Sequence, residues 1–457
     1  MKDATYNLKH AIYLLIVLFY MVNLFFTHAA LDVTLFILAC IALLIALPRA
    51  QRLFFWSAIL FLIVGLAISI TQNTSAGEMI RSFQAMMGLV TIPVVLLFLQ
   101  AVLPVNRYES SMKKMIRLRV HNLGGIYQRT SLFTYVLAAI LTIATLPISI
   151  HSLNRLVPAL KGLSKKRFYT QSMLRGYSLA LFWSPVELVV IASIDLLNAN
   201  YFFLLPILVG LSLVYLNLDW FWQKRRYTLS IEQLHLKSVP HLAKGDAKKI
   251  GQFLCAMLLF FVAVLVTDHL LNKGLVAAIT VVIIPFSIVW AALLGKAHLY
   301  LAYVKRHLPR HLESTHNFFA LFLAAGFFIT MVEQSAVYDW ITRLVTAQFH
   351  QLPLLLFFLF LGALFWITSF AGFHSLITIS LMAQLMAPIA GGIENPLALV
   401  FIGSTVALLM ISPYNLATTM MATLIRTSPI NVFKWNIGYA AGFALLVIFT
   451  AYLLTLF

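Results

Sequence analysis

Residues 179–193, LALFWSPVELVVIAS, form an apolar segment that is interrupted near its centre by Ser184-Pro185. Residues 406–420, VALLMISPYNLATTM, carry the same dipeptide as Ser412-Pro413, about half the chain further along. A proline inside a helix removes a backbone donor and clashes with the preceding turn, so each segment is predicted to unwind at this point. The matching breaks predict an internal duplication. The alternative is two prolines that kink ordinary packed helices, since proline is common in membrane helices.

The composition predicts an all-α polytopic membrane protein. Of 457 residues, 62% are hydrophobic and 10% are charged, with a mean hydropathy of +0.94. Eleven apolar runs have the length that crosses a bilayer as a helix. They lie near residues 11–27, 31–48, 53–71, 86–104, 176–195, 200–218, 251–270, 274–293, 317–335, 396–423 and 434–457. Cys40 and Cys255 stand inside apolar runs, so the sequence predicts neither a disulfide nor a metal site.

Two further apolar stretches, 131–160 and 352–390, have polar centres marked by proline or glycine. These centres are TLPISIHS at 145–152 and TSFAGFHS at 368–375. Each stretch is predicted to be a re-entrant hairpin whose tip stops at mid-membrane. The alternative is that each stretch makes one or two plain crossings.

The distribution of basic residues favours the hairpins. With both stretches re-entrant and the N-terminus cytoplasmic, the inside segments hold 29 of the 32 Lys and Arg residues. The C-terminus is then outside, and the chain is expected in a cell membrane, with the bacterial cytoplasmic membrane as the fitting location. The net charge of +18 is explained by basic loops that face anionic lipid, so no nucleic-acid partner is expected.

The order of segments predicts two repeats after one extra helix. Each repeat contains five crossings, an odd number, so the second repeat is expected to be inverted in the membrane. The predicted parts are an extra helix in 1–30, a first repeat in 31–218 with hairpin 131–160 and broken helix 176–195, a basic cytoplasmic linker in 219–250, and a second repeat in 251–457 with hairpin 352–390 and broken helix 396–423.

Interrupted hydrophobic segments at matching places in two halves are typical of the binding site of secondary transporters. Glu187 follows the first break by two positions, and its counterpart after the second break is Asn415. A carboxylate inside a membrane is expensive and indicates function, so Glu187 is a candidate carrier of H⁺ or Na⁺. The alternative is a structural ion pair of Glu187 with Arg175 or Arg155.

The hairpins supply further candidates for a substrate and ion site. Hydroxyls and freed carbonyls suit a small cation, and a glycine lets the backbone approach a ligand. His151 and His374, which share the local sequence His-Ser-Leu, could carry a proton or contact an anion, although packed histidines are the alternative. Arg155 could contact an anionic substrate or extend to the inner interface. The predicted binding residues are Thr145, Ser149, Ser184, Pro185, Glu187, Thr368, Ser369, Gly372, Ser412, Pro413 and Asn415, with His151, His374 and Arg155 as further contacts.

This layout resembles the ion transporter superfamily, which includes sodium-coupled dicarboxylate, citrate, gluconate and arsenite carriers and a class of sodium/proton antiporters. The resemblance implies one substrate and cation site made by the hairpin tips and helix breaks, alternating access, and a homodimer. Thr145-Leu146-Pro147 and Thr368-Ser369-Phe370 stand where the dicarboxylate branch carries Ser-Asn-Thr.

The sequence therefore predicts an ion-coupled secondary carrier of an organic or inorganic anion. The alternatives are a cation/proton antiporter that uses Glu187, a polytopic enzyme acting on a lipid-linked substrate, and a channel or subunit of a larger assembly. No HExxH, GxSxG or Walker motif is present, so an enzyme is not expected. No cofactor is expected beyond Na⁺ or H⁺ as a coupling ion.

Overall fold

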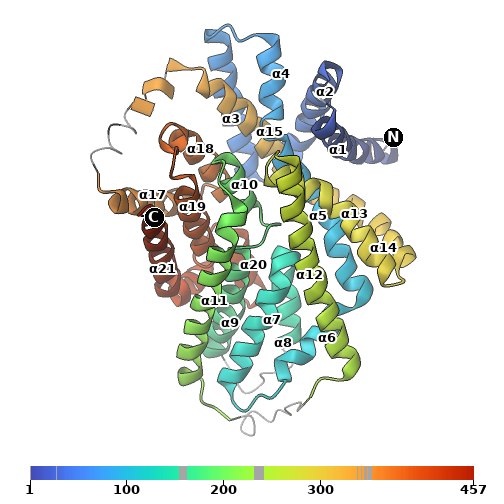
Figure 1. Ribbon diagram of the computed structural model, residues 1–457, viewed down its shortest axis with the longest axis vertical. Helices are drawn as coiled ribbons and strands as arrows, with labels where there is room; N and C mark the ends of the chain where they lie inside the picture. The colour runs from blue at the N-terminus through green and yellow to red at the C-terminus, as the bar shows by residue number, and fades with distance from the viewer. Residues whose placement is uncertain are drawn as a thin grey trace.

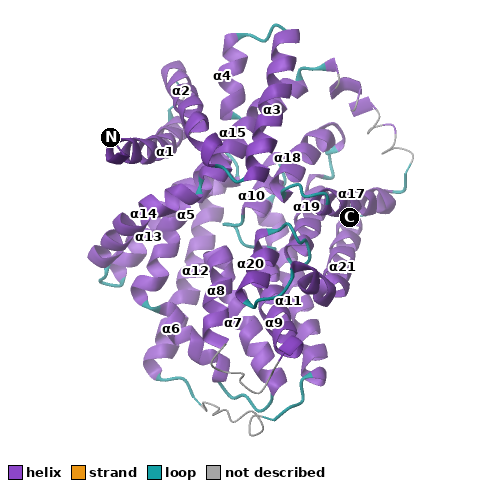
Figure 2. Cartoon of the chain, turned by 180° about the vertical axis from the view of Figure 1, so that it is seen from behind, coloured by secondary structure: helices purple, strands orange, loops and turns teal. Residues whose placement is uncertain are grey.

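A computed structural model describes residues 2–26, 28–153, 162–230, 241–336, 338–340, 342–343, 347 and 352–456. These residues form an elongated assembly of helices joined by short loops (Figures 1 and 2). Within this described part, nine helical stretches are long and apolar enough to cross a membrane by length and composition. The prediction of an all-α polytopic membrane protein is confirmed.

The first half of the chain contains long helices, then a helical hairpin, then an interrupted helix. The long helices and their short companions are α1 (Lys2–Phe25), α2 (Ala29–Ala46), α3 (Arg52–Thr71), α4 (Ala76–Gln84), α5 (Met87–Asn106) and α6 (Tyr108–Lys113). The hairpin is α7 (Leu123–Leu141) with α8 (Thr145–Leu153), the interrupted helix is α9 (Gly162–Leu181) with α10 (Leu188–Leu196), and α11 (Tyr201–Arg226) follows.

The second half repeats this order. Its long helices are α12 (Lys244–Leu271), α13 (Leu275–Leu293), α14 (Ala297–Ser314) and α15 (His316–Glu333). The second hairpin is α17 (Leu354–Phe370) with α18 (Ser375–Met386), the interrupted helix is α19 (Glu394–Leu409) with α20 (Leu416–Leu424), and α21 (Pro429–Leu454) ends the described fold.

The two interrupted helices correspond residue by residue. The repeat offset, which we define as the shift in numbering from Ser184 to Ser412, converts α10 into α20 and α11 into α21 with identical bounds. The same offset relates the left-handed residues Asn198 (φ 52°) and Arg426 (φ 54°) that follow α10 and α20. It also relates Asn200 and Ser428, whose side chains cap α11 and α21. Such agreement in local backbone geometry supports an origin by duplication.

Helices of the two halves also pack reciprocally. α3 of the first half lies along α15 of the second, while α13 of the second lies along α5 of the first. In the same way α10 contacts α18, and α20 contacts α8. Each half therefore completes the packing of the other, and neither forms a separate globular unit.

Several helices are longer than the predicted apolar runs. Their additional turns contain polar and charged residues. α9 begins at Gly162 rather than near 176 and carries Lys165, Lys166 and Arg167 in its first turns. α11 continues to Arg226 and α12 begins at Lys244, so much of the predicted 219–250 linker is helical. Long basic side chains keep their charged groups in water while the backbone stays helical, and hydropathy alone does not detect such extensions.

Three further differences concern polar segments. α1 begins at Lys2 rather than near 11, and α4 and α14 were not predicted as separate helices. α14 is an 18-residue helix between the predicted apolar runs 274–293 and 317–335. Its strongly basic composition hides it from a search for apolar runs. Arg155 lies outside the described residues.

Candidate functional site at the two helix breaks

The first break, residues 182–187, is stabilised by side-chain hydrogen bonds to backbone oxygens at and beside the unwound segment. Pro185 has no N–H, and the Ser184 hydroxyl donates to the backbone oxygen of Ala139 in α7 at 2.7 Å. The Tyr201 hydroxyl donates to the backbone oxygen of Trp183 at 2.6 Å. Because buried carbonyls need partners, these two contacts allow the helix to remain unwound in the interior.

The second break, residues 410–415, is held in a similar way. The Ser369 hydroxyl in α17 donates to the Ser412 hydroxyl at 2.9 Å, and the Ser412 hydroxyl lies 3.5 Å from the backbone oxygen of Ser369. Thr418 donates to the backbone oxygen of Leu409 at 3.0 Å, and the Asn415 side chain caps α20 by accepting from the Ala417 N–H. The serine of each Ser-Pro dipeptide therefore joins its break to the first arm of the hairpin in the same half through a hydrogen bond.

The hairpin and the interrupted helix of each half are also closely packed. A Cβ added to Gly176 in α9 would lie 2.5 Å from the backbone oxygen of Ser131 in α7. At the equivalent position of the second half, Ser404 in α19 faces Gly362 in α17, where an added Cβ would lie 3.2 Å from the Ser404 hydroxyl oxygen. A small residue on one side of each contact lets the two backbones approach, as is usual between membrane helices.

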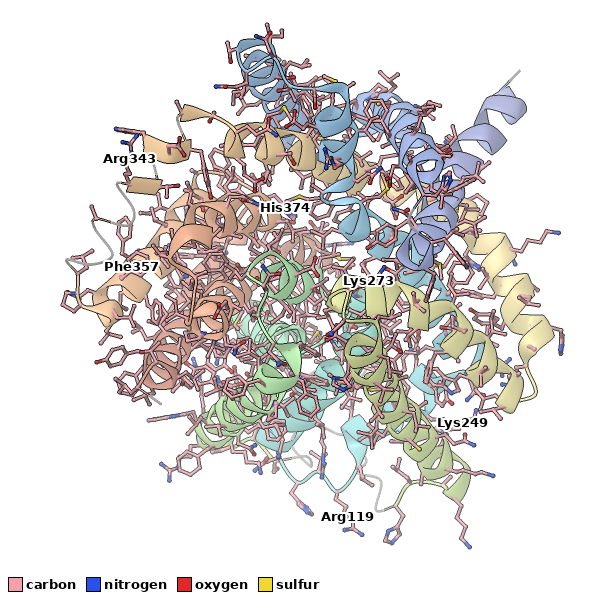
Figure 3. The ribbon with its side chains drawn as sticks, turned by 45° about the horizontal axis from the view of Figure 1, so that its top comes forward. Arg119, Lys249, Lys273, Arg343, Phe357 and His374 are labelled. Atoms are coloured by element: carbon pink, nitrogen blue, oxygen red, sulfur yellow. The ribbon has the colours of Figure 1, made fainter. Side chains whose placement is uncertain are left out.

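The second hairpin turns at the predicted tip, residues 371–374, where Gly372 has φ +95°. A hydroxyl pair closes the tip, since the Thr378 hydroxyl donates to the Thr368 hydroxyl at 3.1 Å. His374 caps α18 and its ring lies 4.8 Å from the ring of Phe54 in α3. Figure 3 shows His374 within the helical assembly, away from the basic side chains Arg119 and Lys249 in the lower part of the view.

The first hairpin turns one helical turn earlier than predicted. Its tip is residues 142–144, with Thr142 at φ 46°, and TLPISIHS forms the second arm α8. Pro147 does not break this arm because it occupies the first turn, where its missing N–H has no helical partner to lose. His151 is consequently an exposed residue near the end of the arm, and it does not occupy a position equivalent to His374.

The hydroxyls predicted in the first hairpin are buried in different environments. Ser149 accepts a hydrogen bond from Thr134 across the hairpin at 3.1 Å. The hydroxyl of Thr145 is buried without a hydrogen-bond partner among the described residues. Further hydroxyls of this kind, which the sequence did not single out, are those of Thr130, Ser131, Ser178, Ser193, Ser404 and Thr405.

These unpartnered hydroxyls come from α7 to α10 and from α19. A buried hydroxyl without a partner costs free energy, so each of these positions is a candidate contact for water or an ion. A serine or threonine within an otherwise apolar run was the available signal in the sequence. That signal is weak, because the hydroxyl can also bond the preceding turn of its own helix.

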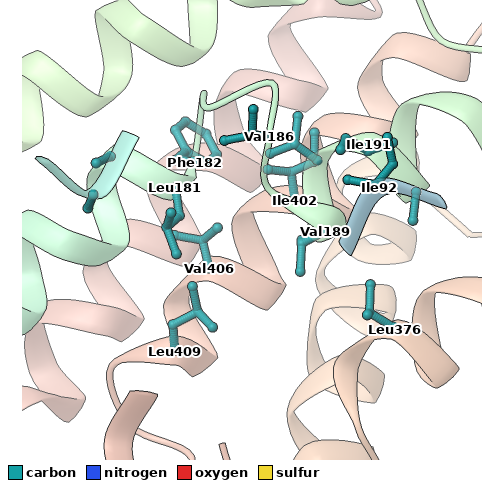
Figure 4. Packing of buried hydrophobic residues seen from close by; sticks show 14 of the residues in the cluster. Ile92, Leu181, Phe182, Val186, Val189, Ile191, Leu376, Ile402, Val406 and Leu409 are labelled. Carbon is teal, nitrogen blue, oxygen red and sulfur yellow. The ribbon is translucent and has the colours of Figure 1, made fainter. Parts of the chain in front are cut away.

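Apolar side chains separate the first break from the second interrupted helix. Figure 4 shows Leu181, Phe182 and Val186 beside Ile402 and Val406 of α19. All five are buried. The polar backbone at each break is therefore paired with its own hairpin, and the contact between the two halves at this level is hydrophobic.

Glu187 occupies the N-cap position of α10 with φ −86° and ψ 122°. Its side chain is half-buried, and Tyr177 in α9 lies within electrostatic range of it. Among the residues that the structure describes, no Lys or Arg forms a salt bridge with Glu187. The alternative of a structural pair with Arg175 is therefore wrong, since Arg175 bonds elsewhere.

Arg175 belongs to a buried polar network. Its guanidinium forms a salt bridge with Asp219 in α11 at 2.5 Å and donates to Asn436 in α21 at 3.0 Å. The Tyr127 hydroxyl donates to the second carboxylate oxygen of Asp219 at 2.6 Å. The ring of Tyr439 lies 4.3 Å from the guanidinium. The network joins α7, α9 and α11 of the first half to α21 of the second.

The equivalent contact of the second half contains no charge. The repeat offset converts Arg175 into Gly403 and Asp219 into Val447. A Cβ added to Gly403 would lie 2.4 Å from a Val447 methyl group, so α19 and α21 touch directly at this point. The two halves are thus equivalent in backbone but different in the chemistry of this helix contact.

Comparison with solved structures identifies a protein with a similar fold. The fold is similar to the crystal structure of the Alcanivorax borkumensis YdaH transporter, which was described as having an unusual topology. The TM-score is 0.59 over 88% of this chain and 97% of that chain, at 13% sequence identity. At this level of identity the likeness concerns the fold. No protein-family model matches the sequence, and no curated protein matches it at a significant level. Membership of the ion transporter superfamily stays a prediction.

Proposed function

We propose that this protein is an ion-coupled secondary carrier, with an organic or inorganic anion as its substrate. The observation that carries the proposal is the repetition, at the repeat offset, of a break fastened to a hairpin by the serine of Ser-Pro. Unwound backbone inside a membrane is tolerated where it lines a cavity or is buried in protein, and paired broken helices are typical of carrier sites. The fold likeness to a transporter supports the same class.

The proposed mechanism is alternating access. The two hairpins and two interrupted helices form one unit through the contacts of α10 with α18 and α20 with α8, while α3, α5, α13 and α15 form a scaffold. Movement of the unit against the scaffold would expose the helix breaks to each side in turn. The preference for an anion rests on the resemblance to anion carriers and on the positive ends of the half-helices α10 and α20.

A cation/proton antiporter is the second candidate. Glu187 favours it, because this carboxylate lies at the break and forms no salt bridge with a described Lys or Arg. In both mechanisms Glu187 would bind the coupling ion, and the two differ in whether an anion moves with that ion.

The proposed inversion of the second half is tested at equivalent positions. The repeat offset relates Ser164 in α9 to Gly392, and Gly391 replaces Gly392 in the test because Gly392 has φ +87°. With Cys40 and Cys255 changed to Ser, a Ser164→Cys variant is expected to react with an impermeant thiol reagent only from the cytoplasm. A Gly391→Cys variant is expected to react only from outside. Labelling of both positions from the same side would contradict the inverted repeat.

The carrier activity is tested with purified protein. A thermal-unfolding screen against carboxylates, inorganic oxyanions, Na⁺ and pH identifies ligands, because a ligand stabilises the folded state by mass action. The anion that stabilises the protein is then offered to proteoliposomes with and without an imposed Na⁺ or pH gradient. Uptake that the gradient drives above equilibrium is expected. Uptake that is the same with and without the Na⁺ and pH gradients would contradict ion coupling. Cation exchange that a gradient drives without anion uptake would favour the antiporter.

A further inference from the structure

We propose that a cavity at the ends of α9, α11 and α21 binds an oxyanion, a phosphate or carboxylate group, between Arg167 and Arg226. The cavity has a volume of about 300 Å³. It is separate from the helix breaks and does not depend on the proposed carrier function. It is lined by Ser164, Arg167, Arg226, Tyr227 and Trp435.

The cavity has an excess of positive charge. Arg167 lies within electrostatic range of two other guanidiniums, those of Arg226 and Arg175. The Nε atom of Arg167 is buried and has no hydrogen-bond partner among the described residues. Like charges held together in a partly buried place destabilise the protein unless an anion lies between them.

The carboxylate of Asp219, which pairs with Arg175, is already engaged by other groups. Asp219 gives one oxygen to Arg175 at 2.5 Å and the other to the Tyr127 hydroxyl at 2.6 Å. Within the described part of the chain, Arg167 forms no salt bridge with a carboxylate. A guanidinium with a free N–H is suited to an oxyanion, because its donors match two oxygens of a phosphate or carboxylate.

The neighbouring basic residues have partners outside the cavity, whereas the Arg226 guanidinium lies 5.8 Å from the ring centre of Tyr227, which lines it. Lys166 donates to the backbone oxygen of Arg426 at 2.6 Å, and the Lys165 ammonium lies 5.6 Å from the ring centre of Tyr169. The Arg225 guanidinium lies 4.0 Å from the ring centre of Phe221. Arg167 and Arg226 are thus distinguished from the general basic character of this end by lining one cavity.

The aromatic walls of the cavity are fixed in place. The Tyr227 ring packs in a cluster with the rings of Tyr127, at 5.9 Å, and Phe168, at 5.1 Å. The backbone oxygen of Tyr227 accepts from the Gly124 N–H at 2.8 Å. On the opposite side, the backbone oxygen of Trp435 accepts from Gln171 at 2.8 Å. Walls that are ordered before binding lower the entropy that a ligand must overcome.

The oxyanion has two possible sources with the same chemistry: a soluble anion or the phosphate of an anionic lipid. The test uses the full-length protein and Arg167→Gln, with Arg226→Gln as the second variant and Arg225→Gln as the matched control. Thermal unfolding is measured in detergent against inorganic phosphate, and in nanodiscs of phosphatidylcholine with or without phosphatidylglycerol.

Phosphate, phosphatidylglycerol or both are expected to raise the unfolding temperature of the parent and of Arg225→Gln. A response to phosphate assigns a soluble anion, and a response to phosphatidylglycerol alone assigns the lipid. Apparent affinity is expected to fall about tenfold or more in Arg167→Gln, because a charge-assisted hydrogen bond is lost. If Arg167→Gln does not fold, the same loss is expected in Arg226→Gln. Equal responses in the parent and in the cavity variants, or no response in the parent, would overturn the proposal.

Discussion

Glu187→Gln is expected to abolish the stabilisation of the protein by its coupling ion and, with it, gradient-driven transport. The side chain lies at the N-cap of α10 and forms no salt bridge with a described Lys or Arg. Gln keeps the size and hydrogen-bonding capacity of the side chain but removes its charge. An ion at 100 times its Kd stabilises the folded state by about 2.7 kcal/mol, and this whole increment should disappear.

The measurement is thermal unfolding across Na⁺ concentration and pH, followed by uptake into proteoliposomes. Glu333→Gln is the matched control, because Glu333 is the last residue of α15, which is neither an interrupted helix nor an arm of a hairpin. The control should keep the response of the parent. Unchanged dependence on both Na⁺ and pH in Glu187→Gln would mean that Glu187 is structural. The coupling site would then lie among the buried hydroxyls of Thr145 and its neighbours.

Asp219→Ala is expected to destabilise the fold by about 3–5 kcal/mol, since it leaves the buried Arg175 guanidinium without a counter-charge. The Tyr127 hydroxyl also loses its acceptor. The loss should appear as a lower unfolding temperature and a lower yield of monodisperse protein. Asp246→Ala is the control, because the Lys114 side chain of the Lys114–Asp246 pair is 57% exposed and stays solvated when Asp246, itself 12% exposed, is removed. Its removal should cost no more than about 1 kcal/mol.

A double variant separates the charge effect from a loss of packing. Arg175→Met with Asp219→Leu removes both charges and keeps most of the volume, so part of the lost stability should return. If Asp219→Ala and Asp246→Ala destabilise the protein equally, the buried network contributes no more to folding stability than the partly exposed Lys114–Asp246 pair. If the double variant is less stable than Asp219→Ala, the hydrogen bonds to Asn436 and Tyr127 contribute more to stability than the attraction between the two charges.

The places where helices break were accessible from sequence, because proline acts locally. Both breaks lie at the predicted dipeptides, and the second hairpin turns at the predicted glycine. The first tip lies earlier than the sequence predicts, because Pro147 stands in the first turn of α8, where a proline is tolerated. The start of α9 and the helices α4 and α14 were missed because their polar residues do not register in a search for apolar runs.

The sequence did not predict which side chains of distant helices contact each other. Arg175 had Glu187 as a possible partner close by in the sequence, whereas the fold pairs it with Asp219 on another helix. Which side chains meet depends on the rotation of each helix about its axis, and one sequence does not fix that rotation. The cavity could not be predicted for the same reason, since its lining residues come from three separate segments of the chain and meet only in the fold.

The uneven chemistry of the two halves has a thermodynamic consequence for a carrier with inverted repeats. If both copies were identical, the inward-facing and outward-facing states would be related by a two-fold rotation and would have equal free energy. Here Arg175 and Asp219 stand in one copy where Gly403 and Val447 stand in the other. The two states would then differ in energy before any substrate or ion binds, so the empty protein is expected to rest on one side of its cycle.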